Sequence, residues 1–220
     1  YLARGESYVQ VGKYDEAIKD FNNAVKLNKQ CIDAYYSRSR VYMMKEDYTS
    51  AMDDFSQCIE LNNKYSDAYI NRGVIFYAIE NDCNKAIKDF DETLRLNPKC
   101  GDAYYYRGRA YLKKEEYENA IEDFNKVLRI TPGFAEAYSN LGLAYYFNGN
   151  LVESLKNFTE SLKLNQDDFA THLNRGEVFS KIGKIDEAKA DGQKAKECTI
   201  VQIKDAAKHK LEKLIRTIEK

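Results

Sequence analysis

The sequence predicts an all-α protein, a right-handed α-solenoid of six helical hairpins followed by a C-terminal capping helix. Three observations support this prediction: a residue pattern that recurs every 34 or 35 positions, apolar side chains spaced as on amphipathic helices, and only two prolines in 220 residues. A single hairpin of this length leaves one apolar face uncovered, and stacking against the next hairpin buries that face. We therefore expect a stack of hairpins rather than a closed globule.

The repeat is clearest at a small residue that is followed four positions later by an aromatic residue. The small residue is alanine except in the fifth copy, and the spacings between copies are 34, 35, 34, 34 and 34 residues. Phenylalanine follows it in the first five copies, and Gly192 takes that place in the sixth. A period of this length predicts one helix–turn–helix unit per copy. The small residues are Ala17, Ala51, Ala86, Ala120, Ser154 and Ala188.

Each copy also carries the pattern of two helices. In the fourth copy, Tyr104, Gly108 and Tyr111 fall at positions i, i+4 and i+7, which lie on one face of a helix. Ala120 and Phe124 share a face of the second helix in the same way. Because Gly108 has no side chain, we expect the second helix to approach the first closely at this point.

The repeat also sets the expected boundaries along the chain. Tyr1 corresponds to the fourth position of the later units, so we expect a truncated first helix and a natural chain that continues upstream. The third unit is one residue longer, and we place the extra residue in the turn at 80–83. Residues 200–220 combine apolar residues at helical spacing with lysines on the other face, as a solubilising cap requires. The six units are expected at residues 1–31, 32–65, 66–100, 101–134, 135–168 and 169–199.

The recurring order of an aromatic opener, a glycine, a tyrosine, an alanine and a phenylalanine resembles the tetratricopeptide repeat (TPR) family. Pro98 and Pro132 stand where that family's pattern ends in proline. The resemblance extends over about residues 1–198. It implies a superhelical stack of hairpins that binds other proteins, with the first helix of each hairpin lining a concave groove.

An arginine and an aspartate change together within the chain. Five copies carry both residues, whereas the fifth copy has Leu141 and Asn157 at the two positions. We therefore expect an ion pair between the two helices of every hairpin except the fifth, one that fixes their register more than it adds stability. The arginines are Arg4, Arg38, Arg72, Arg107 and Arg175, and the aspartates are Asp20, Asp54, Asp89, Asp123 and Asp191.

Two residue types recur at the positions that would face the groove implied by the family. Asparagine amides can donate to and accept from a peptide backbone, and tyrosine is common at protein interfaces. Asparagine at these positions can also be simply solvated, and tyrosine can fill gaps between neighbouring first helices, so both alternatives stay open. The candidate groove residues are Tyr36, Ser37, Arg40, Asn71, Tyr77, Tyr105, Tyr106, Arg109, Asn140, Tyr146 and Asn174.

Some members of the family bind the C-terminal carboxylate of heat-shock chaperones through a clamp of lysine, arginine and asparagine side chains. Units two to four present Tyr36, Arg40, Asn71, Asp102 and Tyr106 at the corresponding positions. Asp102 would repel a carboxylate at a point where the clamp needs a lysine. The sequence therefore argues against chaperone-tail binding by this clamp.

Composition and charge argue against several other functions. The 34 basic and 35 acidic side chains give a net charge of -1, whereas a nucleic-acid surface needs clustered basic excess. No apolar run reaches the roughly 20 residues that span a membrane. His172 falls at a core position and His209 in the cap, so no catalytic, metal or cofactor site is expected. Five scattered cysteines are typical of reduced thiols in a cytoplasmic protein.

These observations together predict a non-catalytic protein–protein interaction scaffold. Its ligand would be a peptide segment or a partner helix held in the groove. The alternative is an accessory arm that recruits substrates or partners for a larger enzyme, of the glycosyltransferase or prolyl isomerase type. The sequence does not specify the partner, the pathway or the oligomeric state.

Overall fold

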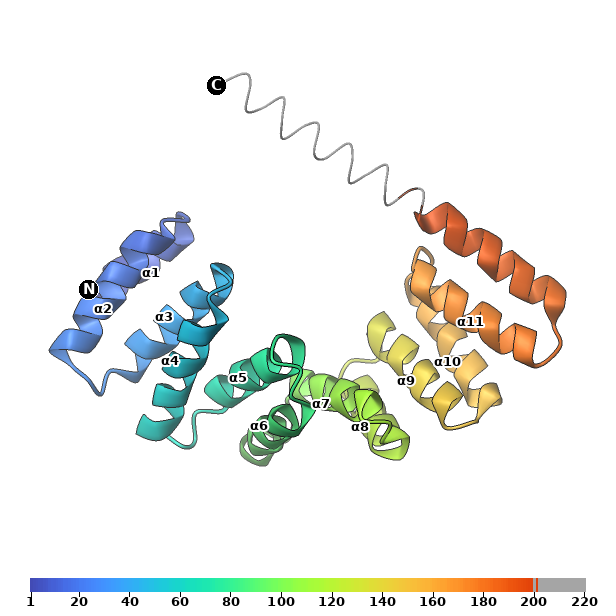
Figure 1. Ribbon diagram of the computed structural model, residues 1–220, viewed down its shortest axis with the longest axis horizontal. Coiled ribbons are helices and arrows are strands. Elements are labelled where there is room, and N and C mark those ends of the chain that lie inside the picture. Colours follow the sequence, from blue (N-terminus) through green and yellow to red (C-terminus); the bar gives the residue numbers. More distant parts are fainter. Residues whose placement is uncertain (200, 202–220) are drawn as a thin grey trace, which may run out of the picture. The chain divides into compact units, whose positions relative to one another are not determined.

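The computed structural model describes residues 1–199 and residue 201, and within this part every regular element is an α-helix (Figure 1). The helices form two compact units, one over residues 1–114 and one from residue 115 onward. In each unit, helices that follow one another in the sequence pack side by side as hairpins, and the hairpins stack. The predicted all-α solenoid is thereby confirmed.

In the first unit, each second helix contacts both its own first helix and the first helix of the next pair. First helices also contact each other, α1 with α3 and α5 with α7, so they share one face of the unit. The helices are α1 (Leu2–Gln10), α2 (Tyr14–Leu27), α3 (Ile32–Met44), α4 (Tyr48–Leu61), α5 (Ser66–Ala78), α6 (Cys83–Leu96) and α7 (Gly101–Lys113).

The second unit continues the same alternation of helices. α9 contacts α8, α10 and α11, so first helices are again neighbours. Residues 185–199 are helical and follow the last of the named helices, whereas the capping helix expected at 200–220 lies outside the described residues. The named helices are α8 (Tyr117–Ile130), α9 (Ala135–Phe147), α10 (Leu151–Leu164) and α11 (Phe169–Lys181).

The turn that follows each first helix carries one residue in the left-handed conformation. Glycine fills this position at three turns, including Gly149, because it adopts a positive φ without steric cost. The turn at 79–82 is one residue longer than those at 45–47 and 148–150, which confirms where the extra residue of the third unit lies. The left-handed residues are Gly12, Glu46, Asn81, Glu115, Gly149 and Gly183.

The core of a hairpin is a phenylalanine of the second helix that lies against a glycine of the first. Phe90 is fully buried, and a Cβ atom placed on Gly73 would lie 2.7 Å from its Cε1 atom. The same holds for Gly142 and Phe158, where the distance is also 2.7 Å. The predicted close approach of the two helices is therefore real, and the ring occupies the space that a side chain would need.

The pattern has one exception in the second unit. Gly192 replaces the phenylalanine opposite Gly176, and a Cβ atom on Gly176 would meet its nearest neighbour, the Ala188 carbonyl oxygen, at 3.3 Å. A Cβ atom on Gly192 itself would meet nothing within 4 Å. The last described hairpin therefore lacks the ring that fills the others.

Substituting Gly73 and Gly192 separately should change stability in opposite directions. Gly73→Ala should lower the free energy of unfolding by about 1–2 kcal/mol, because the strain of overpacking Phe90 exceeds the gain in helix propensity. Gly192→Ala should raise it by about 0.5–1 kcal/mol, since an exposed helical glycine gains only propensity. Urea unfolding followed by circular dichroism measures both. Equal effects from the two substitutions would contradict the close packing described for Gly73.

Candidate functional site

In four hairpins the arginine and the aspartate are joined directly. In the α3–α4 hairpin, Nε and Nη2 of Arg38 donate to the two carboxylate oxygens of Asp54 at 2.7 and 2.6 Å. Both distances are 2.8 Å between Arg72 and Asp89. Arg4 with Asp20 and Arg175 with Asp191 form the same two-pronged pair, which confirms the predicted ion pair in these hairpins.

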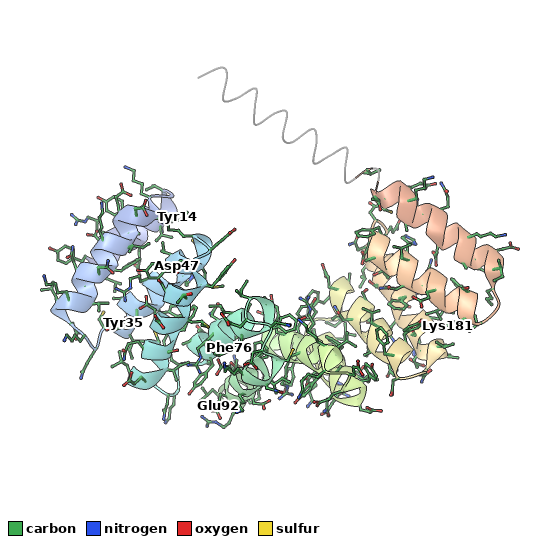
Figure 2. The ribbon with its side chains drawn as sticks, in the orientation of Figure 1. Tyr14, Tyr35, Asp47, Phe76, Glu92 and Lys181 are labelled. Atoms are coloured by element: carbon green, nitrogen blue, oxygen red, sulfur yellow. The ribbon has the colours of Figure 1, made fainter. Side chains whose placement is uncertain are left out.

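Aromatic rings three residues before and four residues after the arginine enclose its guanidinium group. The Cζ atom of Arg38 lies 5.5 Å from the ring centroid of Tyr35 and 6.0 Å from that of Tyr42. Arg72 lies 5.9 Å from Tyr69 and 5.8 Å from Phe76. Tyr35 and Phe76 are labelled in Figure 2. The aromatic repeat therefore stacks on a cation as well as filling the core.

The arginine also reaches the preceding hairpin. Nη1 of Arg38 donates to Asn22 of α2, and Nη1 of Arg72 donates to Ser56 of α4 at 3.0 Å. In the second unit, Nη1 of Arg175 lies 3.4 Å from the hydroxyl of Thr159. We call the aspartate, the two rings and this side chain of the preceding second helix the arginine site. One guanidinium thus links three helices.

The pKa shifts differ among these aspartates, because the hydrogen bond from Arg4 lowers the pKa of Asp20 whereas burial acts the other way in two of the others. Burial raises the pKa of Asp54 and of Asp89 above the usual value, and the hydrogen bonds from Arg38 and Arg72 oppose this rise without cancelling it. A carboxylate whose charged form is disfavoured by folding adds little stability of its own. The pair therefore specifies which residues face each other, as expected from the sequence.

The α9–α10 hairpin has an arginine site without an arginine. Leu141 and Asn157, both buried, replace the ion pair. A cavity of about 370 Å³ opens here, and its lining includes Tyr138, Leu141, Tyr145, Asn157 and Asn125. Leu141 stands at the position of the arginine, and the other four residues stand at the four positions of the arginine site. We call this space the Leu141 cavity.

The candidate groove residues of the first unit lie on α3, α5 and α7. Tyr36 is half-buried and packs on Phe55 and Tyr65, with ring centroids 6.0 and 5.2 Å apart. Asn71 places its amide nitrogen 3.5 Å from the Tyr36 hydroxyl and 2.6 Å from the Asp67 carbonyl oxygen. Part of the hydrogen-bonding capacity of this asparagine is therefore used within its own helix.

Four of the candidates form one aromatic and cationic cluster across α5 and α7. The ring of Tyr106 stacks on Phe90 and lies 6.4 Å from that of Tyr77 and 5.5 Å from that of Tyr105. The Cζ atom of Arg109 lies 5.2 Å from the Tyr77 ring and 5.6 Å from the Tyr105 ring. All four are half-buried, so this cluster both fills the gap between first helices and presents a surface.

Ser37 and Arg40 lie apart from that cluster, in a cavity of about 320 Å³ between α1 and α3. Arg40 is exposed, and Met44 at the end of α3 keeps 47% of its surface accessible. Val9 of α1 completes an apolar wall beside the arginine. This cavity combines apolar side chains with one exposed cation on the face shared by the first helices.

In the second unit, Tyr146 and Asn174 line one small cavity of about 50 Å³ with Phe147. The Tyr146 hydroxyl donates to the carboxylate of Glu177, and Nζ of Lys181, labelled in Figure 2, lies 4.1 Å from the centre of the Tyr146 ring. Asn140 donates to the carbonyl oxygen of Glu136 at 2.7 Å, one turn earlier in its own helix.

Several residues of these surfaces are absent from the predicted set. Val9 shares the cavity of Arg40, and Glu177 and Lys181 contact Tyr146. Applying the groove positions to the truncated first unit would have identified Val9. The lining of the Leu141 cavity was also missed, although the joint change of Leu141 and Asn157 marks its place in the sequence.

No group of three or more histidine, cysteine, aspartate or glutamate residues is close enough to hold a metal ion within residues 1–199 and 201. Nor does any helix in that part have the length and apolar character to cross a membrane. Nδ1 of the buried His172 lies 3.0 Å from Asp191, and Nε2 lies 3.0 Å from the carbonyl oxygen of Gln166. This histidine therefore has a structural role in its hairpin.

Repeated helical hairpins joined by a recurring set of contacts define an α-solenoid repeat protein. Family models described as TPR repeat match residues 5–45 and 108–149, and models of the tetratricopeptide repeat match residues 32–65 and 135–168. The matches together extend over more than half of the sequence. The chain belongs to the tetratricopeptide repeat family. A comparison with curated proteins gave no significant match.

Solved structures share this fold. MamA is 27% identical, with a TM-score of 0.70 over 74% of this chain and 94% of its own. YrrB, described as a TPR protein with an unusual peptide-binding site, is 22% identical, with a TM-score of 0.71 over 78% of this chain and 88% of its own. A TPR protein from Parabacteroides merdae is 20% identical, with a TM-score of 0.74 over 86% of this chain and 75% of its own.

The arginine site predicts an asymmetry between single and double substitutions. Arg38→Leu leaves Asp54 buried without its cation and should lower the free energy of unfolding by about 3–5 kcal/mol. Adding Asp54→Asn copies the Leu141 and Asn157 pair of the α9–α10 hairpin and should recover most of this loss. Thermal and urea unfolding at neutral pH measure both variants. A double variant no more stable than Arg38→Leu would show that the aspartate is not the source of the cost.

Proposed function

We propose that the chain is a non-catalytic scaffold that binds a segment of another protein on the faces of its first helices. The cavity between α1 and α3 carries this proposal. It offers apolar contact through Val9 and Met44, and the exposed guanidinium of Arg40 stands beside them. Its volume of about 320 Å³ suits one or two side chains of a bound segment.

The aromatic cluster on α5 and α7 extends the proposed surface within the first unit. Tyr77 and Tyr105 lie on either side of Arg109, and Lys113 lies 5.5 Å from the Tyr77 ring. Tyrosine and arginine often dominate binding energy at protein interfaces, because they combine a large contact area with directed hydrogen bonds. We therefore assign to this cluster the main contacts with the partner's side chains.

Asparagine has a smaller part in this proposal than in the sequence-based expectation. Asn71 and Asn140 each donate to a carbonyl oxygen of their own helix, at 2.6 and 2.7 Å. Such a bond holds the amide of Asn71 in place and leaves its oxygen as an acceptor for a backbone N–H group of a bound peptide. We propose that Asn71 orients the backbone of the segment, with tyrosine and arginine supplying most of the affinity.

Two further observations support a binding role inside the cell. YrrB, which shares this fold, is described as having a peptide-binding site. The five cysteines are free thiols, as is usual in the reducing cytoplasm. We propose a cytoplasmic partner that is either an extended peptide or a helix.

A peptide selected from a phage-displayed library against the full chain tests the proposal. Arg40→Ala and Tyr77→Ala should each weaken binding of the selected peptide by about tenfold or more, measured by isothermal titration calorimetry. Arg95→Ala is the matched control, because Arg95 is an exposed arginine on the second helix α6 and its ion-pair partner, Glu92, lies in the same helix. The control should bind with unchanged affinity.

The opposite pattern of results would refute the assignment. If Arg95→Ala weakens binding as much as Arg40→Ala does, the peptide does not recognise the first-helix face. Circular dichroism of each variant ensures that a loss of binding is not a loss of folding.

A further inference from the structure

The Leu141 cavity keeps the two rings and the side chain of the preceding second helix of an arginine site, with Asn157 in place of the aspartate and Leu141 in place of the arginine. In the α3–α4 hairpin, Tyr35 and Tyr42 stack on Arg38, and Asn22 accepts a hydrogen bond from it. In the α9–α10 hairpin, Tyr138, Tyr145 and Asn125 stand at the same three positions and line the cavity. Two rings and an acceptor are thus arranged around a space that, in the other hairpin, holds a guanidinium.

The two asparagines of the cavity present acceptor atoms. Nδ2 of Asn125 donates to the Ile121 carbonyl oxygen, and Nδ2 of Asn157 donates to the Glu153 carbonyl oxygen, both at 2.8 Å. Each amide group then keeps one N–H donor and the two acceptor positions of its oxygen, so acceptors outnumber donors among the sites left for an incoming group. A ligand rich in N–H donors is therefore favoured over an anion.

We propose that the Leu141 cavity receives the guanidinium group of an arginine side chain from a partner protein. Leu141 is shorter than arginine and extends no further than the aliphatic stem of Arg38 would, so the space beyond it matches the place of the guanidinium. A guanidinium is flat, stacks on aromatic faces and carries five donors in a fixed plane. A lysine ammonium is a compact point charge that cannot stack in this way.

The chain does not fill the cavity with a guanidinium group of its own. Arg129 lines the cavity, yet it is exposed and carried by α8, so it lies at the opening. The carboxylates of Glu153 and Glu160 and the ammonium of Lys156 complete the rim, and Lys156 lies 3.3 Å from Glu153. Charges of the rim nearly cancel, so the rings and the asparagine oxygens determine selectivity.

This inference goes beyond the proposed function and stands apart from it. The cavity is formed by α8, α9 and α10 of the second unit, and it contains none of the candidate groove residues. A partner's arginine could enter it whether or not the first-helix faces bind a peptide. The test therefore uses an arginine probe alone.

The probe is the peptide acetyl-Gly-Arg-Gly-amide, titrated into the ¹⁵N-labelled 220-residue chain and followed by NMR. The side-chain amide signals of Asn125 and Asn157 should shift and saturate with a Kd of about 1–10 mM, as expected for one side chain. The lysine peptide should bind at least about tenfold more weakly, because it cannot stack as a plane. The citrulline peptide, which has the shape without the charge, should bind less than the arginine peptide.

Two double variants provide matched controls. Leu141→Arg with Asn157→Asp fills the cavity with the pair found in other hairpins and should abolish the shifts at Asn125. Arg38→Leu with Asp54→Asn opens the equivalent space beside Asn22, Tyr35 and Tyr42, and should create a second response at Asn22. The first variant removes a site and the second adds one, so a general loss of folding cannot imitate both results.

Three outcomes would overturn the proposal. They are the absence of a saturable shift at Asn125 and Asn157, equal affinity for the lysine peptide, and an unchanged response in the Leu141→Arg, Asn157→Asp variant. Saturation by inorganic phosphate with no response to the arginine peptide would assign the cavity to anions instead.

Discussion

The packing of a phenylalanine ring on a glycine sets the distance between the two helices in the hairpins that carry both residues, as with Gly5, Gly73 and Gly142. The ring of Phe90 fills the space beside Gly73, and the small residue Ala86 is fully buried nearby. Arg72 precedes the glycine and Asp89 precedes the phenylalanine, so the same close approach brings cation and carboxylate together. The ring contact and the ion pair thus lie side by side in this hairpin, although Arg175 and Asp191 form the same pair where Gly192 replaces the ring.

A buried ion pair that adds little stability still restricts how the hairpins stack. Arg38 reaches Asp54 within its hairpin and Asn22 in the hairpin before it. A shift of one helix by a residue would break both contacts and leave charge buried, which is strongly unfavourable. The α9–α10 hairpin avoids this penalty because both positions differ, and a cavity lies beside the shorter side chain of Leu141.

Much of the fold could be predicted from the sequence, because a repeat displays the same contact several times. The helices follow from the spacing of small and aromatic residues, and the ion pair follows from the joint change of Leu141 and Asn157. The stacking of Arg38 on Tyr35 and Tyr42 could not be predicted, since it depends on the side-chain rotamers within α3. The Leu141 cavity could not be predicted because it joins side chains of α8, α9 and α10, whose relative rotation the sequence does not specify. Asn71 illustrates a further limit. Its amide nitrogen donates to the Asp67 carbonyl oxygen, one turn earlier in the same helix. The residue type alone does not show whether an asparagine makes this local hydrogen bond or keeps its amide for a ligand.

Gly192 makes the packing of the last described hairpin differ from that of the other hairpins. Without a ring to fill the space beside Gly176, residues 185–199 bury less apolar surface against α11 than α6 buries against α5. In a solenoid each hairpin is held mainly by its immediate neighbours, so a weak interface is not compensated from a distance. We therefore expect the backbone amides of residues 185–199 to exchange with solvent faster than those of α6.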